Sequence, residues 1–239
     1  NKLLEPFPIH YPPLFVLTKT RESTEFDQFV MIRPWVAVGL LVTVIYAACP
    51  GGIPDSEVKA ILKSHNILRS NISKGKYIAT LVVDRLKNIT ITKNMPAARK
   101  KMPIKALKWD CGLEISAQKV ASECKNAHSN AQTRGLIGEN LWSFSSSAVL
   151  KIKGMGKAAS DAWKHEFQEF GWPSVYYTVD MFNVGLGHAT QMAWHNTTTM
   201  GCGIALCNDK HWAIVACQYN VTGNFLGAPI YYPKDSLML

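Results

Sequence analysis

Apolar residues recur at the spacing of an α-helix in three stretches of the chain, and each stretch predicts a helix with one buried face. The first helix is predicted to begin at Pro54. Asp55, Ser56 and Glu57 follow, and they offer a capping side chain together with early negative charge. The apolar face of this helix consists of Val58, Ile61, Leu62, His65 and Leu68.

The second helix is predicted to follow Trp109-Asp110-Cys111, and its apolar face reaches His128 if the helix is extended by one turn. That face consists of Leu113, Ala117, Val120, Ala121 and Cys124. The third helix is predicted over residues 157–170, where Gly171 ends it. Its inward face consists of Ala159, Trp163, Phe167 and Phe170. Glu166 falls on the same face, so its carboxylate needs a polar partner.

Alternating apolar positions predict two strands near the end of the chain, over residues 200–206 and 212–219, joined by a turn at residues 208–210. The region from 75 to 103 has a weak pattern. Within it, residues 78–83 and 89–91 are interpreted as short strands or as loop, and the pattern does not choose between them.

Residues 185–194 place three polar side chains, His188, Thr190 and Gln191, inside an apolar run that follows two glycines. A polar group on an apolar face must be hydrogen-bonded, metal-bound or functional, because burying it unpaired is costly. This segment is therefore the strongest local indication of a functional site.

The first 48 residues differ from the rest of the chain. Residues 1–30 contain several prolines and no sustained periodicity, so we interpret them as an upstream segment that is non-native or disordered. Residues 31–48 combine Arg33, a short apolar run and small residues at its end, which is typical of a secretory signal peptide. Translation would then start at Met31. An uncleaved signal anchor is the alternative, although a membrane-spanning helix needs roughly 20 apolar residues.

The composition of the 239 residues, 47% hydrophobic and 18% charged, is that of a globular protein rather than a disordered one. We expect residues 49–239 to form a single domain. The net charge of +9 favours anionic partners in general. No nucleic-acid-binding motif accompanies this charge, so we expect no nucleic-acid partner.

All six cysteines follow the predicted signal peptide, and an even number in that context indicates an oxidising compartment and three disulfides. Many pairings are compatible with the spacing alone. Four N-x-S/T sequons agree with secretion and are candidate glycosylation sites: Asn71, Asn88, Asn196 and Asn220.

Four titratable residues are candidates for one site: His128, Glu139, Glu166 and His188. Two imidazoles and two carboxylates around one cavity could hold a divalent metal such as zinc. They could equally act as general acids and bases without a metal. The alternative is that each residue is a satisfied hydrogen-bonding partner in the core.

Five blocks of the sequence, in this order, resemble diagnostic motifs of the CAP superfamily, which contains cysteine-rich secretory, antigen-five and pathogenesis-related-one proteins. The blocks are His65-Asn66-x-x-Arg69, Cys124-x-x-x-His128-Ser129, residues 138–141 (GENL), residues 187–194 (GHATQMAW) and residues 214–225 (IVACQYNVTGNF). Residues 94–111 and Ala189 are most similar to the activation-associated secreted proteins of parasitic nematodes, also called venom-allergen-like proteins.

The resemblance implies a three-layer α-β-α sandwich of the α+β class, with an antiparallel sheet between helical layers. It places His128, Glu139, Glu166 and His188 around one open cavity, where the two histidines bind zinc in several relatives. It also implies the disulfides Cys49–Cys111, Cys124–Cys207 and Cys202–Cys217.

For function, the resemblance implies a secreted, non-enzymatic parasite effector or immunomodulator whose partners are host proteins or receptors. Sterol or fatty-acid binding, in grooves separate from the cavity, is a further property of relatives. No stable membrane insertion is expected after signal cleavage. The alternative is a hydrolase, of the zinc-dependent or serine type, that uses the same cavity. Against it, His165-Glu166 begins an H-E-x-x-H motif but position 169 is glutamate, and Ser129 lacks a nucleophile-elbow context.

The remaining polar residues receive structural interpretations. His65 and Asn66 are expected to hold the first helix in place, and His195 and His211 to lie at the surface or at strand ends. Residues 99–101 (RKK) are interpreted as a solvated loop in preference to a polysaccharide-binding site.

Overall fold

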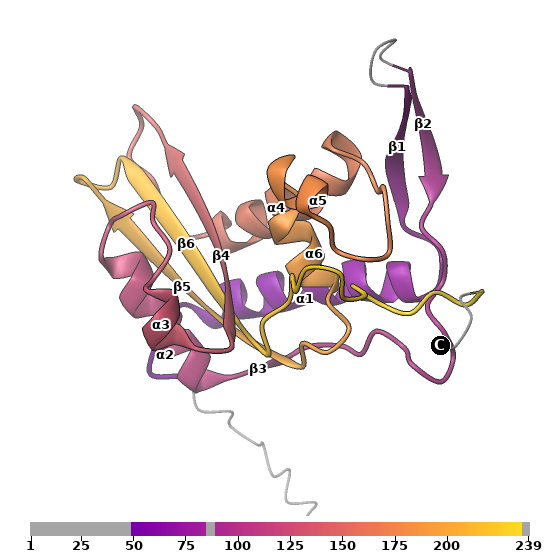
Figure 1. The fold of residues 1–239 in the computed structure, drawn as a ribbon. Coiled ribbons are helices and arrows are strands. Elements are labelled where there is room, and N and C mark those ends of the chain that lie inside the picture. Colours follow the sequence, from indigo (N-terminus) through magenta and orange to yellow (C-terminus); the bar gives the residue numbers. More distant parts are fainter. Residues whose placement is uncertain (1–48, 85–88, 236–239) are drawn as a thin grey trace, which may run out of the picture. The chain divides into compact units, whose positions relative to one another are not determined.

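The computed structural model describes residues 49–84 and 89–235 (Figure 1). The predicted upstream segment, the predicted signal peptide and the sequon at Asn88 lie outside the described residues. Among the helices of the described part, none is both long enough and apolar enough to cross a membrane.

A four-stranded sheet forms the centre of the fold, with the strand order β3-β5-β6-β4 (Figure 1). β5 (Thr199–Cys207) and β6 (Trp212–Asn220) form the predicted hairpin. β4 (Ile137–Ser145) pairs antiparallel with β6, and the short β3 (Lys108–Trp109) runs parallel to β5.

Helices cover both faces of this sheet. Residues 213–219 of β6 are buried without alternation, which requires cover on each face. Ile214 and Ala216 pack in a small cluster with α2 (Cys111–Ser122). Val215, Cys217 and Tyr219 belong to the large cluster of the other face. The α-β-α sandwich that the resemblance implies is therefore confirmed.

The layer on that other face contains α1 (Asp55–Ser73), α4 (Met155–Glu169) and the short α6 (Gly187–Ala193), which contact one another. Two further short helices, α3 (Ala131–Arg134) and α5 (Val179–Asn183), follow α2 and α4 along the chain. The three long predicted helices are thus present, close to their predicted bounds.

The predicted cap of α1 is wrong, because Pro54 is the N-cap residue and no side chain bonds there. Glu57 instead crosses to α4, where its buried carboxylate accepts from Gly154 N (2.6 Å) and Gly156 N (3.0 Å). A carboxylate is stabilised at a helix N-terminus by the unpaired N–H groups there. Glu57 therefore joins α1 to the start of α4.

The second helix does not extend to His128. α2 begins after Asp110, whose side chain accepts from Leu113 N, and it ends at Ser122. Cys124 adopts a φ of +52°, which is incompatible with continuing the helix. His128 consequently lies in a loop.

Two glycines of β5 allow α2 to approach the sheet closely. A Cβ atom on Gly203 would lie 2.2 Å from Gln118 Cα, and one on Gly201 would lie 2.2 Å from Glu114 N. Any larger residue at these positions would have to push the helix away from the sheet.

The region from 75 to 103 forms a second, two-stranded sheet in which β1 (Ile78–Asp84) pairs antiparallel with β2 (Ile89–Asn94). Of the two interpretations left open for these residues, the strands are therefore correct. Met95 and Ala98, which follow β2, are buried in the large cluster and hold the segment after the hairpin against the sandwich.

Three disulfides are present, Cys49–Cys111, Cys124–Cys207 and Cys202–Cys217, and these are the pairs that the resemblance implies. The third joins directly opposite residues of β5 and β6, while the second joins the end of α2 to β5. No cysteine of the described residues is free.

Candidate metal and ligand cavity

The buried helix α6 carries His188, and its other polar residues are hydrogen-bonded to the segment that follows β6. The Thr190 hydroxyl donates to Asn224 Oδ1 (2.7 Å), and Gly223 N donates to Gln191 Oε1 (2.7 Å). These bonds account for two of the three polar residues in the apolar run. His188 is left as the one that reaches a cavity.

Glu166 of α4 is the partner of His188. Its Oε1 lies 2.6 Å from His188 Nδ1, and Ala189 N donates to its Oε2 (2.9 Å). Because a carboxylate only accepts hydrogen bonds, the tautomer of a neutral imidazole here carries its proton on Nδ1 and leaves the lone pair on Nε2. Trp163 stacks on the imidazole, with ring centroids 5.9 Å apart and planes inclined by 22°. The ring is therefore held by a hydrogen bond and by a stacking contact.

His128 has the corresponding partner in Glu139 of β4, with Nδ1 2.9 Å from Oε1. Glu139 also accepts from Ser129 N and Oγ, from Gln218 Nε2 and from Arg134 Nη1, at 2.7 to 3.1 Å. Burial by itself would raise the pKa of Glu139, but the hydrogen bonds from His128, Gln218 and Ser129 outweigh it and lower the pKa to about 2. The carboxylate is therefore charged at neutral pH.

Both histidines line one cavity of about 530 Å³. Glu139 also lines it, whereas Glu166 contacts it only through His188. Three exposed apolar side chains are also part of the lining, and we call them the apolar rim: Val179, Phe182 and Leu226. The four predicted residues thus form two histidine–carboxylate pairs that meet at one cavity.

A line of buried polar side chains supports the backbone at His188. Asn140 Nδ2 donates to His188 O (3.1 Å) and to the Tyr219 hydroxyl (3.2 Å). That hydroxyl lies 2.9 Å from His65 Nε2, and His65 Nδ1 lies 2.9 Å from Ile61 O. Since a carbonyl only accepts, Nδ1 holds the proton and Tyr219 donates to Nε2.

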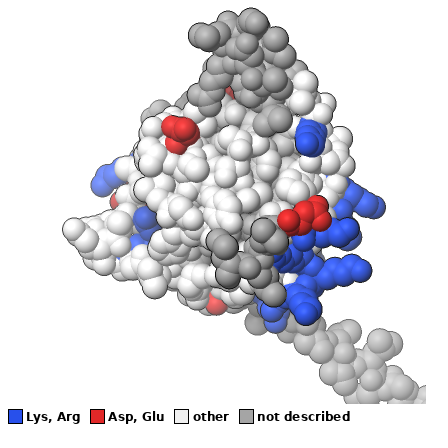
Figure 2. Space-filling view, turned by 45° about the vertical axis from the view of Figure 1, so that its right-hand side comes forward, with Lys and Arg blue, Asp and Glu red and all other residues white. Residues whose placement is uncertain are grey.

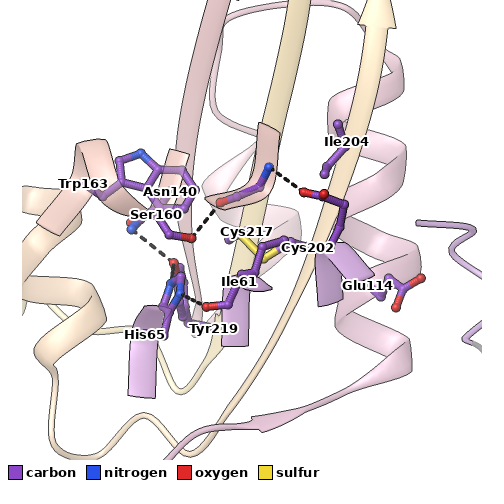
Figure 3. Close-up of a disulfide and its surroundings, with 12 residues drawn as sticks. Ile61, His65, Glu114, Asn140, Ser160, Trp163, Cys202, Ile204, Cys217 and Tyr219 are labelled. Atoms are coloured by element: carbon purple, nitrogen blue, oxygen red, sulfur yellow. Dashed lines mark hydrogen bonds between the residues drawn. A yellow bond between two sulfur atoms is a disulfide. The ribbon is translucent and has the colours of Figure 1, made fainter. Parts of the chain in front are cut away.

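The ring of His65 stays neutral, because burial lowers its pKa to about 4. Figure 3 shows His65, Tyr219 and Asn140 together, with the Cys202–Cys217 disulfide close by. His65 therefore has the structural role expected for it, as does Asn66, which exchanges two hydrogen bonds with the backbone of Leu107.

Arg69 is a buried cation to which the sequence reasoning gave no role. Its guanidinium donates to the carbonyls of four residues at 2.7 to 2.9 Å: Lys105, Met192, Trp194 and Thr197. Two of these carbonyls lie at the C-terminal end of α6, where a cation is favourable. Burial lowers the pKa of Arg69 to about 9. Its position four residues after His65, on the same face of α1, was a signal for this role.

The geometry of Ser129 does not support the serine-hydrolase alternative. Its hydroxyl donates to Glu139 (2.7 Å) and accepts from Arg134 Nη1 (2.9 Å), so it does not face an imidazole. A carboxylate with a pKa of about 2 is also a weak base. His165, in the partial metalloprotease motif, is exposed on α4 and does not line the cavity.

Three of the candidate glycosylation sites can be placed. Asn196 and Asn220 are exposed, whereas Asn71 is partly buried within α1. Glycosylation stays a prediction at each of them. His195 and His211 are both partly buried and lie outside the cavity, His211 at the turn of the β5–β6 hairpin.

Among the described residues, no three His, Cys, Asp or Glu side chains form a group that could hold a metal ion alone. The cavity instead offers two imidazole nitrogens, a ligand type that suits zinc and other transition metals. In each pair the carboxylate on Nδ1 is the partner that metal-binding histidines usually have. The donor set therefore fits a metal held by two protein ligands, with further positions open.

Comparisons with known proteins agree with the fold. The Ancylostoma secreted protein of Ancylostoma caninum is 34% identical over 77% of the chain, although the chain spans only 41% of that protein's length. Venom allergen 3 of Solenopsis invicta is 33% identical, with 77% of this chain and 75% of the relative covered.

Two solved structures match the fold with a TM-score of 0.67 and cover 78% of the chain. The structure of BmVAL-1 is 33% identical with 87% of its own chain covered, and that of NaASP2 with Zn2+ is 32% identical with 90% covered. The sequence model of CAP, the cysteine-rich secretory protein family, matches residues 62–219. The chain therefore belongs to the CAP family and resembles its venom-allergen-like and Ancylostoma-secreted members.

Proposed function

We propose that this protein is a secreted CAP protein that binds a divalent transition metal, zinc foremost, in the cavity through Nε2 of His128 and His188. The observation that carries the proposal is that two histidines from separate elements line one cavity, each with its Nδ1 held by a carboxylate. That arrangement leaves both Nε2 atoms as unprotonated donors. The structure of a similar protein, NaASP2, with Zn2+ also supports the proposal.

The metal would supply Lewis acidity and open coordination positions for a ligand. The residues of this chain would orient it and leave room beside it. Because the protein supplies only two donors, the fraction of sites that hold a metal depends on the metal concentration and on the ligands that fill the remaining coordination positions. Because imidazole binds a metal only when neutral, affinity falls as the pH drops through the histidine range.

A zinc titration by calorimetry on the disulfide-intact protein tests this proposal, with a His128→Ala/His188→Ala double variant beside it. His165→Ala is the matched control, because it removes an exposed histidine outside the cavity. We expect the wild type and the control to bind one zinc ion and the double variant to bind none. Equal binding by the double variant would overturn the proposal.

We further propose that the protein acts as a non-enzymatic effector on host proteins or receptors. Its likeness to the Ancylostoma secreted protein and to Venom allergen 3 supports this role. A peptidase and esterase screen with zinc present tests the hydrolase alternative, and we expect the wild type to release no more product than the double variant.

A sterol or fatty acid is the small ligand that we propose in addition, and the apolar rim supports an apolar moiety near the metal. Titration with a fluorescent fatty acid and a fluorescent sterol, with and without zinc, tests it. A Phe182→Ser variant, which removes the most exposed apolar side chain of the rim, should weaken binding if the ligand lies there. Unchanged binding would place the ligand elsewhere.

A further inference from the structure

Three segments that are distant in the sequence bring six basic residues to one surface, which we call the basic face. Its residues are Lys74, Lys76, Arg99, Lys100, Lys101 and Lys234. Backbone hydrogen bonds join the segments: Ala98 N donates to Ser73 O (3.1 Å), Arg99 N to Tyr232 O (2.8 Å) and Lys234 N to Ala97 O (2.7 Å). The run at residues 99–101 is therefore one part of a larger cationic surface.

The basic face has almost no compensating negative charge. Between Asp84 and Asp110 the chain contains eight Lys or Arg residues and no Asp or Glu. Five of the six side chains of the basic face are exposed, Arg99 is partly buried, and none forms an ion pair within the described residues. Asp235 is the acidic neighbour at its edge. Figure 2 shows Lys and Arg side chains gathered on one side of the molecule.

The backbone holds these cations in place. Arg99 O accepts from Met102 N (3.1 Å), which closes a turn around residues 99–101, and the buried Ala98 and Ile104 fix its two ends. Keeping like charges together on an ordered surface is unfavourable unless a counter-charge is present. A preformed cationic surface binds a polyanion with less loss of conformational freedom than a flexible tail does.

We propose that the basic face binds a sulfated polysaccharide, a linear polyanion outside cells. Clusters of Lys and Arg bind heparin-like polymers through charge complementarity. Met102 is the only exposed large apolar side chain of the three segments, so a surface that inserts into a membrane is not favoured. No aromatic side chain of these segments is highly exposed, which argues against stacking on single-stranded nucleic acid.

This inference is independent of the metal cavity, because no residue of the basic face lines the cavity. It revises the interpretation of residues 99–101 as a solvated loop. The reason for the revision is that Lys74, Lys76 and Lys234 lie beside the run and add their positive charge to it.

The test measures binding of a size-defined heparin oligosaccharide by calorimetry at several salt concentrations. Two triple variants remove the charge from different segments: Arg99→Gln/Lys100→Gln/Lys101→Gln and Lys74→Gln/Lys76→Gln/Lys234→Gln. A matched control removes three exposed lysines elsewhere, Lys119→Gln/Lys151→Gln/Lys153→Gln. We expect each test variant to lose about tenfold in affinity and to show a shallower salt dependence, and the control to keep its affinity.

Equal losses in the control variant would show that only net charge matters and would overturn the inference. Tighter binding of desulfated heparin, of vesicles rich in phosphatidylserine or of duplex DNA would overturn the choice of partner. The urea unfolding midpoint of each variant, compared with that of the wild type, checks that the fold is intact. Because this check does not use zinc, failure of this inference and failure of the metal proposal are distinguishable.

Discussion

In the His128–Glu139 pair only the carboxylate is firmly held, whereas in the His188–Glu166 pair both side chains are. The Glu139 side chain is 0% exposed and accepts from four residues, while the His128 side chain lies in a loop and is 52% exposed. His188 is 35% exposed, and it lies on a buried helix and stacks on Trp163. The same two functional groups are thus held in two different ways.

Because they are held differently, the two pairs depend on different parts of the fold. Glu139 holds the loop that carries His128, because His128, Ser129 and Arg134 all donate hydrogen bonds to its charged carboxylate. Glu166 has fewer donors to satisfy, and α6 is held mainly by Arg69, Asn140 and Gln191. Substitutions should therefore damage the two halves of the cavity to different extents.

The largest expected effect comes from the anchor of α6. Arg69→Met should lower the free energy of unfolding by about 4 kcal/mol, because four carbonyl groups lose their donor. Urea unfolding with intact disulfides measures the loss. Lys63→Met, at an exposed position of the same helix, is the control and should change stability little. A loss below about 1 kcal/mol for Arg69→Met would contradict this role.

The two carboxylates themselves provide the next comparison. Glu139→Gln should lower the free energy of unfolding by about 3 kcal/mol, since Arg134 and Ser129 lose a charged acceptor. Glu166→Gln should lower it by about 1 kcal/mol, because within the described part of the chain that carboxylate accepts from His188 and Ala189 alone. The same urea measurement compares them, and equal losses would refute the asymmetry.

The pH dependence of the free energy of unfolding should separate the contribution of Glu139 from that of the buried His65. The pKa of Glu139 falls from 4.5 to about 2 on folding, so its stabilisation is complete above pH 4.5 and is lost as the pH falls through about 2. The pKa of His65 falls from 6.5 to about 4, so the unfolded chain takes up its proton first and stability declines between those values.

Midpoints of urea unfolding, measured between pH 7 and pH 2, test the two pH ranges in which His65 and Glu139 affect stability. Glu139→Gln should remove most of the decline below pH 4.5, and His65→Gln should remove most of the decline above pH 4. If both variants kept the wild-type pH profile, other groups would be responsible for the acid sensitivity.

Ser129→Ala should have an effect as small as that of Glu166→Gln. It should lower the free energy of unfolding by about 1 kcal/mol, because the lost hydroxyl bonds Glu139 and Arg134, and both of these keep other partners. Zinc affinity should not change, because Glu139 keeps its bond to His128. Calorimetry with zinc checks the second point, and a large loss of affinity would show that Ser129 takes part in metal binding.

Much of the fold could be predicted because it depends on local periodicity. The apolar stripes of α1, α2 and α4 and the β5–β6 hairpin follow from side chains that are neighbours in the sequence. The four candidate residues could be named from the sequence, three of them within family motifs and Glu166 from its place on an apolar helix face. Periodicity could not show that they meet, because they lie on separate elements. The hairpin of β1 and β2 stayed undecided, since its pattern is too short and weak to exclude a loop.

The errors have a common cause. Glu57 was grouped with the residues that cap and charge the start of its own helix, and the apolar stripe of α2 pointed to His128 as its next turn. Each was judged from its sequence neighbours alone. In the structure, Glu57 bonds to α4 and His128 lies in a loop held by Glu139. A charged side chain binds whichever partner the fold brings near, and that partner is seldom close in sequence.

The sequence by itself determined the helical and strand faces, the even set of cysteines and the residue types of the cavity. Only the tertiary structure decided which histidine meets which carboxylate, that Arg69 holds the end of α6, and that three basic segments form one face. The physical reason is that periodicity depends on residues one or two turns apart. Hydrogen bonds and charge clusters depend on segments that meet only when the chain has folded.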